Sequence, residues 1–489
     1  MLRHNFYAKA RSALAASPVA STFFASLLIS LVAALNASTI GRDASLYLDV
    51  ALTFNEFGWG AAYQRFNWPW YSALIGILHK CTNIPIIPLA YTVNAFFMAG
   101  ACCIVVKVVN ERMPEASWWA CLVVLAIPAF NEYRNDILRE FGFWFFSILA
   151  LYWIISWSEI GGWSRLLGTY VAILLAASFR LEALFLVAVV CVWQILSIRG
   201  KGGIRRVVSV VFPPLAGVLF LGFFLQFYAA DGYASRLVDY MSLLSPESTL
   251  DSFRGFSGSI AESMKTKYSR SEAGEIAFFG IVGTILYGFL KSLGVFIVVF
   301  LLCSQKVDIK ISRSLWLLFG LAFLFYFLVL LVFFLQKQYT ADRYSSFLGF
   351  LVVPFLAVMA LRFSRSYPGL GKVLIALGVI TMLANVVSLG GGKAHYKEAA
   401  YWIKENIDAD SRVYFLDRRI AFYAGMAVPA HTYPEKEAVG GMASQFDYFV
   451  TRYSENDSDM AELAAGESVR KVASFENSDG EVINIFFRK

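Results

Sequence analysis

The sequence predicts a polytopic α-helical membrane protein with a small α/β domain at its C-terminal end. Of its 489 residues, 58% are hydrophobic and only 16% are charged. The mean hydropathy of +0.60 agrees, and such a composition lies far outside that of soluble proteins. From Gly390 onward the composition becomes that of a soluble domain. We therefore expect a membrane domain over residues 1–390 and a soluble domain over residues 391–489.

The charge and the cysteines exclude several other classes. The formal net charge is +7, but the basic residues lie in short loops between apolar runs, where membrane topology explains them better than nucleic-acid binding does. Most of the six cysteines lie inside apolar runs, as small buried hydrophobic residues do. The sequence shows no disulfide or metal framework. We expect that no cofactor is required; a divalent metal is compatible with the sequence but not indicated by it.

The N-terminal segment resembles a signal peptide, because a basic stretch over Met1–Pro18 precedes an apolar run over Ser21–Asn36. The many later apolar runs favour an uncleaved first helix with its N-terminus in the cytoplasm.

The segment 39–84 is predicted to be an outer loop with two helices lying on the membrane. Apolar residues recur there at helical spacing, namely Leu46, Val50, Phe54 and Phe57. Gly58 breaks this pattern, and a second short helix is expected over Trp70–Leu78. The aromatic residues at its start, Trp68 and Tyr71 among them, suit a membrane interface.

Further apolar runs predict about eleven membrane helices in all. They extend over Ile86–Val106, Ser117–Phe130, Phe141–Trp157, Leu166–Ile198, Val207–Phe227, Ile276–Cys303, Leu315–Leu335, Phe347–Leu361 and Val373–Leu389. The run from Leu166 is too long for one ordinary helix. The basic loop Arg199–Arg206 lies in the cytoplasm only if this run crosses twice, so we expect an outer turn at Arg180 and Glu182. Lys291 is expected at a helix break or facing the protein interior.

This topology places the C-terminal domain outside the cytoplasm. Its expected elements are a helix over His395–Asn406, strands over Arg412–Leu416 and Phe446–Thr451, a helix over Met460–Ala465, and paired strands over Val472–Phe475 and Val482–Phe487. We assign no chemistry to this domain.

The same topology gathers the remaining charged residues near the membrane on the outer face. These are Arg42, Asp43, Arg134, Asp136, Arg139, Glu140, Arg180, Glu182, Lys337, Asp342 and Arg343. Basic residues are depleted from outer loops unless something holds them there, and an anionic lipid phosphate is a suitable ligand.

Two roles fit each of the main candidates. Asp43 either caps the helix that follows it or acts as a general base at the membrane surface. Asp136 either orients a substrate or pairs with a neighbouring arginine. Arg180 either pairs with Glu182 at the outer turn or faces a phosphate, and Arg343 either binds a phosphate or anchors the next helix at the interface.

Several short motifs resemble the GT-C glycosyltransferases, and within them the protein O-mannosyltransferase and aminoarabinose transferase group. They are Arg42-Asp43 with Tyr47, Asn67 to Tyr71, Arg134 to Glu140, Phe179 to Glu182, and Asp342-Arg343-Tyr344, followed in the soluble domain by Tyr401-Trp402-Ile403 and Tyr423-Ala424-Gly425. The likeness runs through nearly the whole chain. Family members often carry Asp-Glu in the first loop, whereas this chain has Arg42-Asp43 followed by Ala44.

The resemblance implies transfer of a sugar from a polyprenyl-phosphate donor to a hydroxyl of a lipid, glycan or protein. The enzyme would work with inversion at the outer face of a bacterial inner membrane. The catalytic candidates are Asp43 and Asp136. The candidates for binding the donor phosphate are Arg343, Tyr344, Arg134, Arg139, Arg180 and Lys337. The candidates for lining the substrate site are Tyr47, Glu140, Trp68, Tyr71 and Tyr339.

Two other functions compete with the transferase. An O-antigen ligase or polymerase acting on diphosphate-linked glycans would also place arginines on the outer face. A transporter should show internal repeats and charges near the membrane midplane; the sequence shows no clear repeat, and its charges crowd at one edge. The surface helix with an acidic residue after the first span favours the transferase.

Overall fold

The computed structural model describes residues 17–198, 203–228, 245–302, 312–384, 386, 392–429, 433–452 and 469–488. The chain packs into two compact units. The first contains residues 1–31, 93–134 and 139–386, and the second contains residues 32–92, 135–138 and 387–489. The predicted polytopic helical fold with a small C-terminal sheet is confirmed. The predicted helix over Met460–Ala465 and the basic residues before Pro18 lie outside the described residues.

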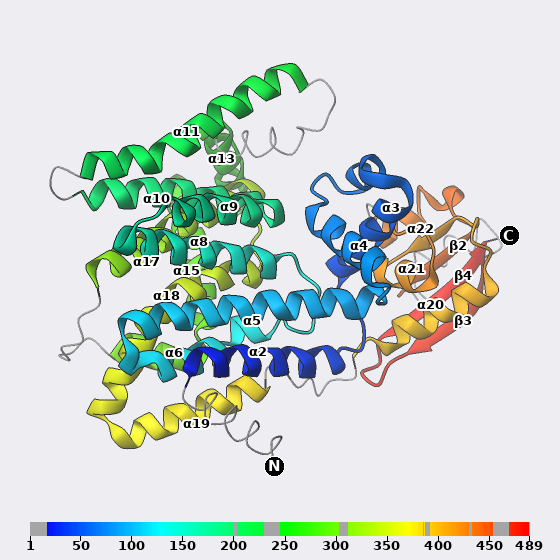
Figure 1. Cartoon of the computed structure of the whole chain (residues 1–489). Coiled ribbons are helices and arrows are strands. Elements are labelled where there is room, and N and C mark those ends of the chain that lie inside the picture. The colour runs from blue at the N-terminus through cyan, green and yellow to red at the C-terminus, as the bar shows by residue number, and fades with distance from the viewer. Residues whose placement is uncertain are drawn as a thin grey trace, which may run out of the picture. The chain divides into compact units, whose positions relative to one another are not determined.

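The first unit is a bundle of apolar helices (Figure 1). Among the described residues, six helices are long and apolar enough to cross a membrane: α2 (Pro18–Leu35), α5 (Ile86–Arg112), α8 (Glu140–Ile160), α15 (Ala273–Ser292), α17 (Arg313–Lys337) and α18 (Asp342–Ser366). Shorter apolar helices are α6 (Ser117–Ala126), α9 (Trp163–Phe179), α10 (Phe185–Leu196) and α19 (Pro368–Ala384). The unit also contains α7 (Pro128–Asn131), α11 (Gly203–Tyr228), α13 (Pro246–Ser263), α14 (Lys267–Ser271) and α16 (Ile297–Leu302).

The chain does break between Phe179 and Leu181, as predicted. Arg180 has an extended backbone conformation between α9 and the 3-10 helix η2 (Leu181–Leu184). The run predicted as one helix over Ile276–Cys303 is interrupted, because Gly294 adopts a φ of 55° directly after α15. A side chain at Gly294 would also meet Pro128, with a Cβ 2.7 Å from its ring. Lys291 lies in the last turn before this break.

The run predicted over Ser117–Phe130 is interrupted as well. Helix α6 ends at Ala126, and Pro128 starts the separate short helix α7. A proline cannot donate the backbone hydrogen bond that a continuous helix would need at this point.

The second unit contains a four-stranded sheet in the order β1-β2-β4-β3. Its strands are β1 (Val413–Phe415), β2 (Tyr448–Thr451), β3 (Val469–Glu476) and β4 (Val482–Arg488), with β1 and β2 parallel and the other pairs antiparallel. Successive strand residues alternate between the two faces. Ile483 and Ile485 share a core with helices α20 (Ala394–Asn406) and α21 (Arg418–Ala424), whereas Phe449 and Phe486 share a core with α22 (Glu435–Val439).

The predicted outer loop packs against the C-terminal domain within this second unit. It contains α3 (Arg42–Arg65), which is kinked where Gly58 adopts a φ of 82°, and α4 (Trp70–Thr82). The Tyr423 hydroxyl accepts a hydrogen bond from the Ile40 backbone N–H at 3.0 Å, and Arg65 donates to the Val428 carbonyl at 2.8 Å. The soluble domain therefore holds α3, and α3 in turn packs against α4.

Candidate active site

The two carboxylates predicted as catalytic lie at the same helix end in the second unit. Helix α3 starts at Arg42, with Gly41 as its N-cap and Asp43 in its first turn. The Asp136 carboxylate lies against Gly41, so closely that a Cβ added there would be 1.9 Å from Asp136 Oδ1. Only glycine allows this approach. Both carboxylates are near the positive end of the α3 dipole, which stabilises negative charge.

The position of Asp43 in α3 argues against the capping role considered for it. Gly41 occupies the N-cap position, and Asp43 lies two residues inside the helix. A side chain caps a helix from the N-cap residue itself. Asp43 is therefore not the cap of α3.

Basic residues of the C-terminal domain surround this helix end. The charge of Arg42 acts on both Asp417 and Arg418, and the charge of Asp43 acts on Arg418. Burial alone raises the pKa of Asp417, but the hydrogen bonds and charge of Arg419 outweigh it and hold that pKa below its usual value. The two residues form a bidentate pair, with N···O distances of 2.8 and 2.9 Å. Both positive and negative side chains thus lie near the start of α3.

The aromatic residues predicted to line the substrate site differ in their exposure to solvent. Tyr47 and Tyr71 are buried, and their rings meet edge to face at 5.6 Å between α3 and α4. Trp68 is only partly buried at the entrance to α4. Tyr47 and Tyr71 thus hold the two surface helices together.

The first unit contains a separate, buried cluster of charged residues, which we call the arginine cluster: Arg139, Glu140, Arg180, Glu182 and Arg343. Arg180 donates to Glu140 Oε1 at 2.9 Å and to Glu182 Oε1 at 2.7 Å. All three side chains are at most 11% exposed. The predicted pairing of Arg180 with Glu182 is present, and Arg180 pairs with Glu140 as well.

Arg343 and Tyr344 join this cluster from the start of α18. Arg343 Nε lies 3.5 Å from Glu140 Oε1, and its side chain is 22% exposed. The Tyr344 ring lies between two guanidinium groups, 4.4 Å from that of Arg180 and 5.4 Å from that of Arg343. The charge of Arg139 acts on Glu182. Three guanidinium groups thus face two carboxylates, which leaves the cluster with a net positive charge.

Some polar atoms of the arginine cluster are buried without a hydrogen-bond partner among the described residues. They are Glu140 Oε2, Glu182 Oε2 and Arg180 Nε. Buried polar atoms are almost always paired, and exceptions are frequent at functional sites.

Three other predicted residues do not join the cluster. Arg134 is 3% exposed and donates to Ser26, Ser30 and Asn131, tying α7 to α2 within the first unit. Lys337 and Tyr339 are exposed around the end of α17. The partners of Arg134 indicate a structural role for this residue.

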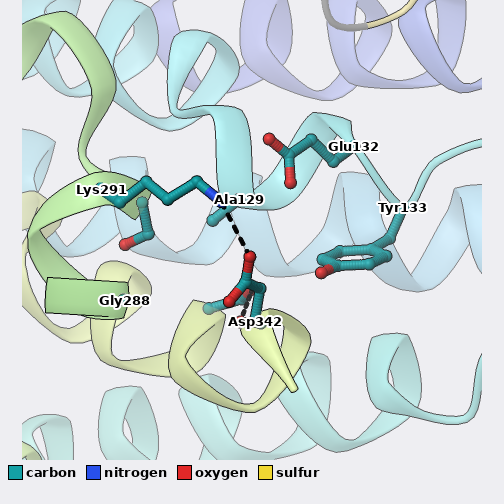
Figure 2. A pocket seen from close by; sticks show the side chains of 8 residues that line it. Ala129, Glu132, Tyr133, Gly288, Lys291 and Asp342 are labelled. Carbon is teal, nitrogen blue, oxygen red and sulfur yellow. Dashed lines mark hydrogen bonds and ion pairs between the residues drawn. The ribbon is translucent and has the colours of Figure 1, made fainter. Parts of the chain in front are cut away.

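A small polar pocket lies beside Asp342, the residue before Arg343. Figure 2 shows Lys291 Nζ reaching the Asp342 carboxylate, which it contacts at 3.1 Å, with Glu132 and Tyr133 on the other side. The cavity volume is about 20 Å³, which is room for roughly one water molecule. The ion pair with Asp342 explains why a lysine is present at the end of the apolar helix α15.

Two features of these sites were missed from the sequence. Tyr326 was not predicted as a site residue, yet its hydroxyl donates to the Tyr344 carbonyl at 3.0 Å. Arg418 was also missed, because nothing in the sequence links α21 to the first loop. Among the described residues, no group of three or more His, Cys, Asp or Glu side chains is placed to hold a metal.

The fold agrees with the helical membrane fold that the motifs predicted. It is similar to the crystal structure of ArnT from Cupriavidus metallidurans bound to undecaprenyl phosphate, with a TM-score of 0.62, 11% identity, and coverage of 96% of this chain and 97% of that chain. The apo structure of the same ArnT gives a TM-score of 0.44 at 12% identity, covering 97% and 98% of the two chains. The first likeness shows the fold, and the second is too distant to support an argument. No family model matches this chain, and neither does any curated protein.

Proposed function

We propose that this protein is a membrane glycosyltransferase that moves a sugar from a polyprenyl-phosphate donor to an acceptor hydroxyl. The observation that carries the proposal is a fold shared over 96% of the chain with a protein crystallised with undecaprenyl phosphate. The net positive charge of the arginine cluster supports it. The acceptor is a hydroxyl of a lipid, a glycan or a protein at the outer face of a bacterial inner membrane.

The proposed reaction is a direct displacement. The acceptor oxygen attacks the anomeric carbon, its proton passes to the Asp43 carboxylate, and the bond between that carbon and the phosphate oxygen breaks. The polyprenyl phosphate leaves with the bonding electron pair. A single displacement inverts the anomeric centre, as in the one-step route of inverting glycosidases. Asp136, which lies against Gly41, is proposed to orient the acceptor.

The arginine cluster is proposed to stabilise the leaving phosphate. Negative charge grows on that phosphate as the bond breaks, so a positioned guanidinium stabilises the transition state more than the ground state. Arg343 is the best placed of the cluster for this role, because its side chain is 22% exposed while that of Arg180 is 6% exposed.

Replacing Arg343 by Lys tests the phosphate site. Lys keeps the charge but lacks the planar fork that makes two-point contact with a phosphate. We expect binding of undecaprenyl phosphate to the purified protein to weaken about tenfold to a hundredfold, the equivalent of one charge-assisted contact. Native mass spectrometry of the protein titrated with undecaprenyl phosphate measures this.

The matched control is Arg365→Lys, at the other end of the same helix, where Arg365 pairs with Glu115. This variant should bind like the wild type. Wild-type affinity in Arg343→Lys would move the phosphate site to Arg139. A lower thermal stability with unchanged affinity for undecaprenyl phosphate would show that Arg343 serves its ion pair with Glu140 and does not bind the phosphate.

The proposed orientation has the N-terminus in the cytoplasm and the C-terminal domain in the periplasm. The basic loop after Ile198 and the basic residues Arg362, Arg365 and Lys372 support it. Alkaline phosphatase fused after Lys489 should be active, and a cytoplasmic reporter at the same point should not. The reverse result would contradict both the helix count and the outer site.

The activity is tested by comparing the cell envelope with and without the protein. Mass spectrometry should show one envelope component losing the mass of a single sugar when the protein is absent. Loss of a whole oligosaccharide would instead favour a ligase or polymerase acting on a diphosphate-linked glycan.

A further inference from the structure

A second polar cavity lies in the first unit, at the helix ends that do not carry the arginine cluster. It has a volume of about 540 Å³, within the range of small-molecule sites. Its polar lining residues are Ser158, Gln194, Ser197, Arg206, Ser312, Arg313 and Ser314. The cavity contains two arginines and no carboxylate among its lining residues, so it favours an anion.

The cavity is far from the arginine cluster. Glu140 is the first residue of α8, and Ser158 lies eighteen residues later on the same helix. At a rise of 1.5 Å per residue this separation is about 27 Å, which is close to the thickness of the hydrocarbon core of a bilayer. Helix α17 also separates the two, because Arg313 begins it and Tyr326, which contacts Tyr344 beside the cluster, lies thirteen residues later, or about 20 Å along the helix. The cavity and the cluster therefore lie toward opposite ends of the apolar helices.

The groups around the cavity have unused capacity to bind an anion. Gln194 lines the cavity and is only 4% exposed, and its side-chain amide makes no hydrogen bond to the described residues. Helix α17 begins here, and its N-cap Ser312 makes no capping hydrogen bond, so backbone N–H groups of the first turn are available. Arg206 makes one long hydrogen bond, of 3.4 Å, to the Ser158 carbonyl.

The walls of the cavity are themselves fixed. The Trp193 indole donates to the Ser314 carbonyl at 3.1 Å, which joins α10 to the start of α17. Trp193 is 1% exposed. This contact fixes the neighbouring residues Gln194 and Arg313 in the lining of one preformed site.

We propose that this cavity binds a phosphate group, at the membrane face opposite the proposed sugar transfer. Two guanidinium groups, a buried amide and a helix N-terminus are the donors that phosphate oxygens accept from. Basic pockets between membrane helices at the cytoplasmic side are suited to anionic lipid headgroups. The site does not depend on the proposed transferase activity, because none of its residues belongs to the arginine cluster or to the start of α3.

The test uses the full-length protein purified in detergent and titrated with phosphatidylglycerol, followed by native mass spectrometry. The double variant Arg206→Gln, Arg313→Gln should bind phosphatidylglycerol at least about tenfold more weakly than the wild type, since each lost arginine contact alone accounts for such a factor. Gln194→Leu, which keeps the size of the side chain and removes its donor, should also weaken binding. Phosphatidylcholine is the reference lipid for headgroup charge.

The matched control is Arg205→Gln, which removes the neighbouring charge on α11 outside the cavity lining. It should leave binding unchanged. Competition by millimolar inorganic phosphate would support a site that also accepts free phosphate, and failure to compete would support a lipid headgroup. Equal binding by the wild type and the double variant, or an equal loss in Arg205→Gln, would overturn the proposal.

Discussion

Replacing Asp43 by Asn is expected to lower the turnover of sugar transfer by about a hundredfold or more, which is the usual contribution of a general base. Asn keeps the shape of the side chain but cannot accept the proton of the attacking hydroxyl. Asp43 is not the N-cap of α3, so the change removes the effect of its charge on Arg418 and its interaction with the helix dipole. That interaction contributes about 0.3–1 kcal/mol, and the protein should remain folded. Turnover is measured with purified protein and its polyprenyl-phosphate donor.

The control for this experiment is Glu56→Gln, which neutralises an exposed carboxylate on the same helix. It should retain wild-type turnover. Binding of undecaprenyl phosphate should be nearly unchanged in Asp43→Asn, since the base acts on the acceptor. Near-normal turnover of Asp43→Asn would rule out Asp43 as the base and leave Asp136 as the next candidate.

Replacing Arg180 by Ala should destabilise the protein by about 3–5 kcal/mol, the usual effect of breaking a buried ion pair from one side. The change leaves the carboxylates of Glu140 and Glu182 buried without their main partner, and these side chains are 3% and 11% exposed. The measurement is the thermal unfolding midpoint of the detergent-purified protein. We expect a large decrease in that midpoint.

Arg112 offers a matched control because it also pairs with two glutamates. Arg112 itself is 8% exposed, but its partners Glu111 and Glu159 are 38% and 44% exposed. Water therefore solvates their carboxylates when the arginine is removed, and the loss should be about 0–1 kcal/mol. Arg112→Ala should therefore change the midpoint little. A triple variant, Arg180→Met with Glu140→Gln and Glu182→Gln, should recover much of the loss because it removes the isolated charges. An unchanged midpoint in Arg180→Ala would show that the cluster is hydrated rather than buried.

The sequence by itself determined the local architecture of this protein. Apolar runs separated by basic loops define membrane helices. In lipid, a single segment can hydrogen-bond all of its own backbone N–H and C=O groups only as a helix. The break at Arg180 followed from run length and loop charge. The strands of the C-terminal domain followed from their alternation, since each of these signals depends on residues close together in the chain.

Only the tertiary structure decided which distant residues meet. The motif Arg134 to Glu140 shows the difference: Arg134 donates to α2, Asp136 lies against Gly41, and Glu140 pairs with Arg180. These neighbouring residues look alike in the sequence, yet their partners lie on different helices. Which partner each one meets depends on how those helices pack. The sequence therefore determined that charged residues gather near the ends of apolar helices, and packing determined which of them form a buried cluster and which hold the fold together.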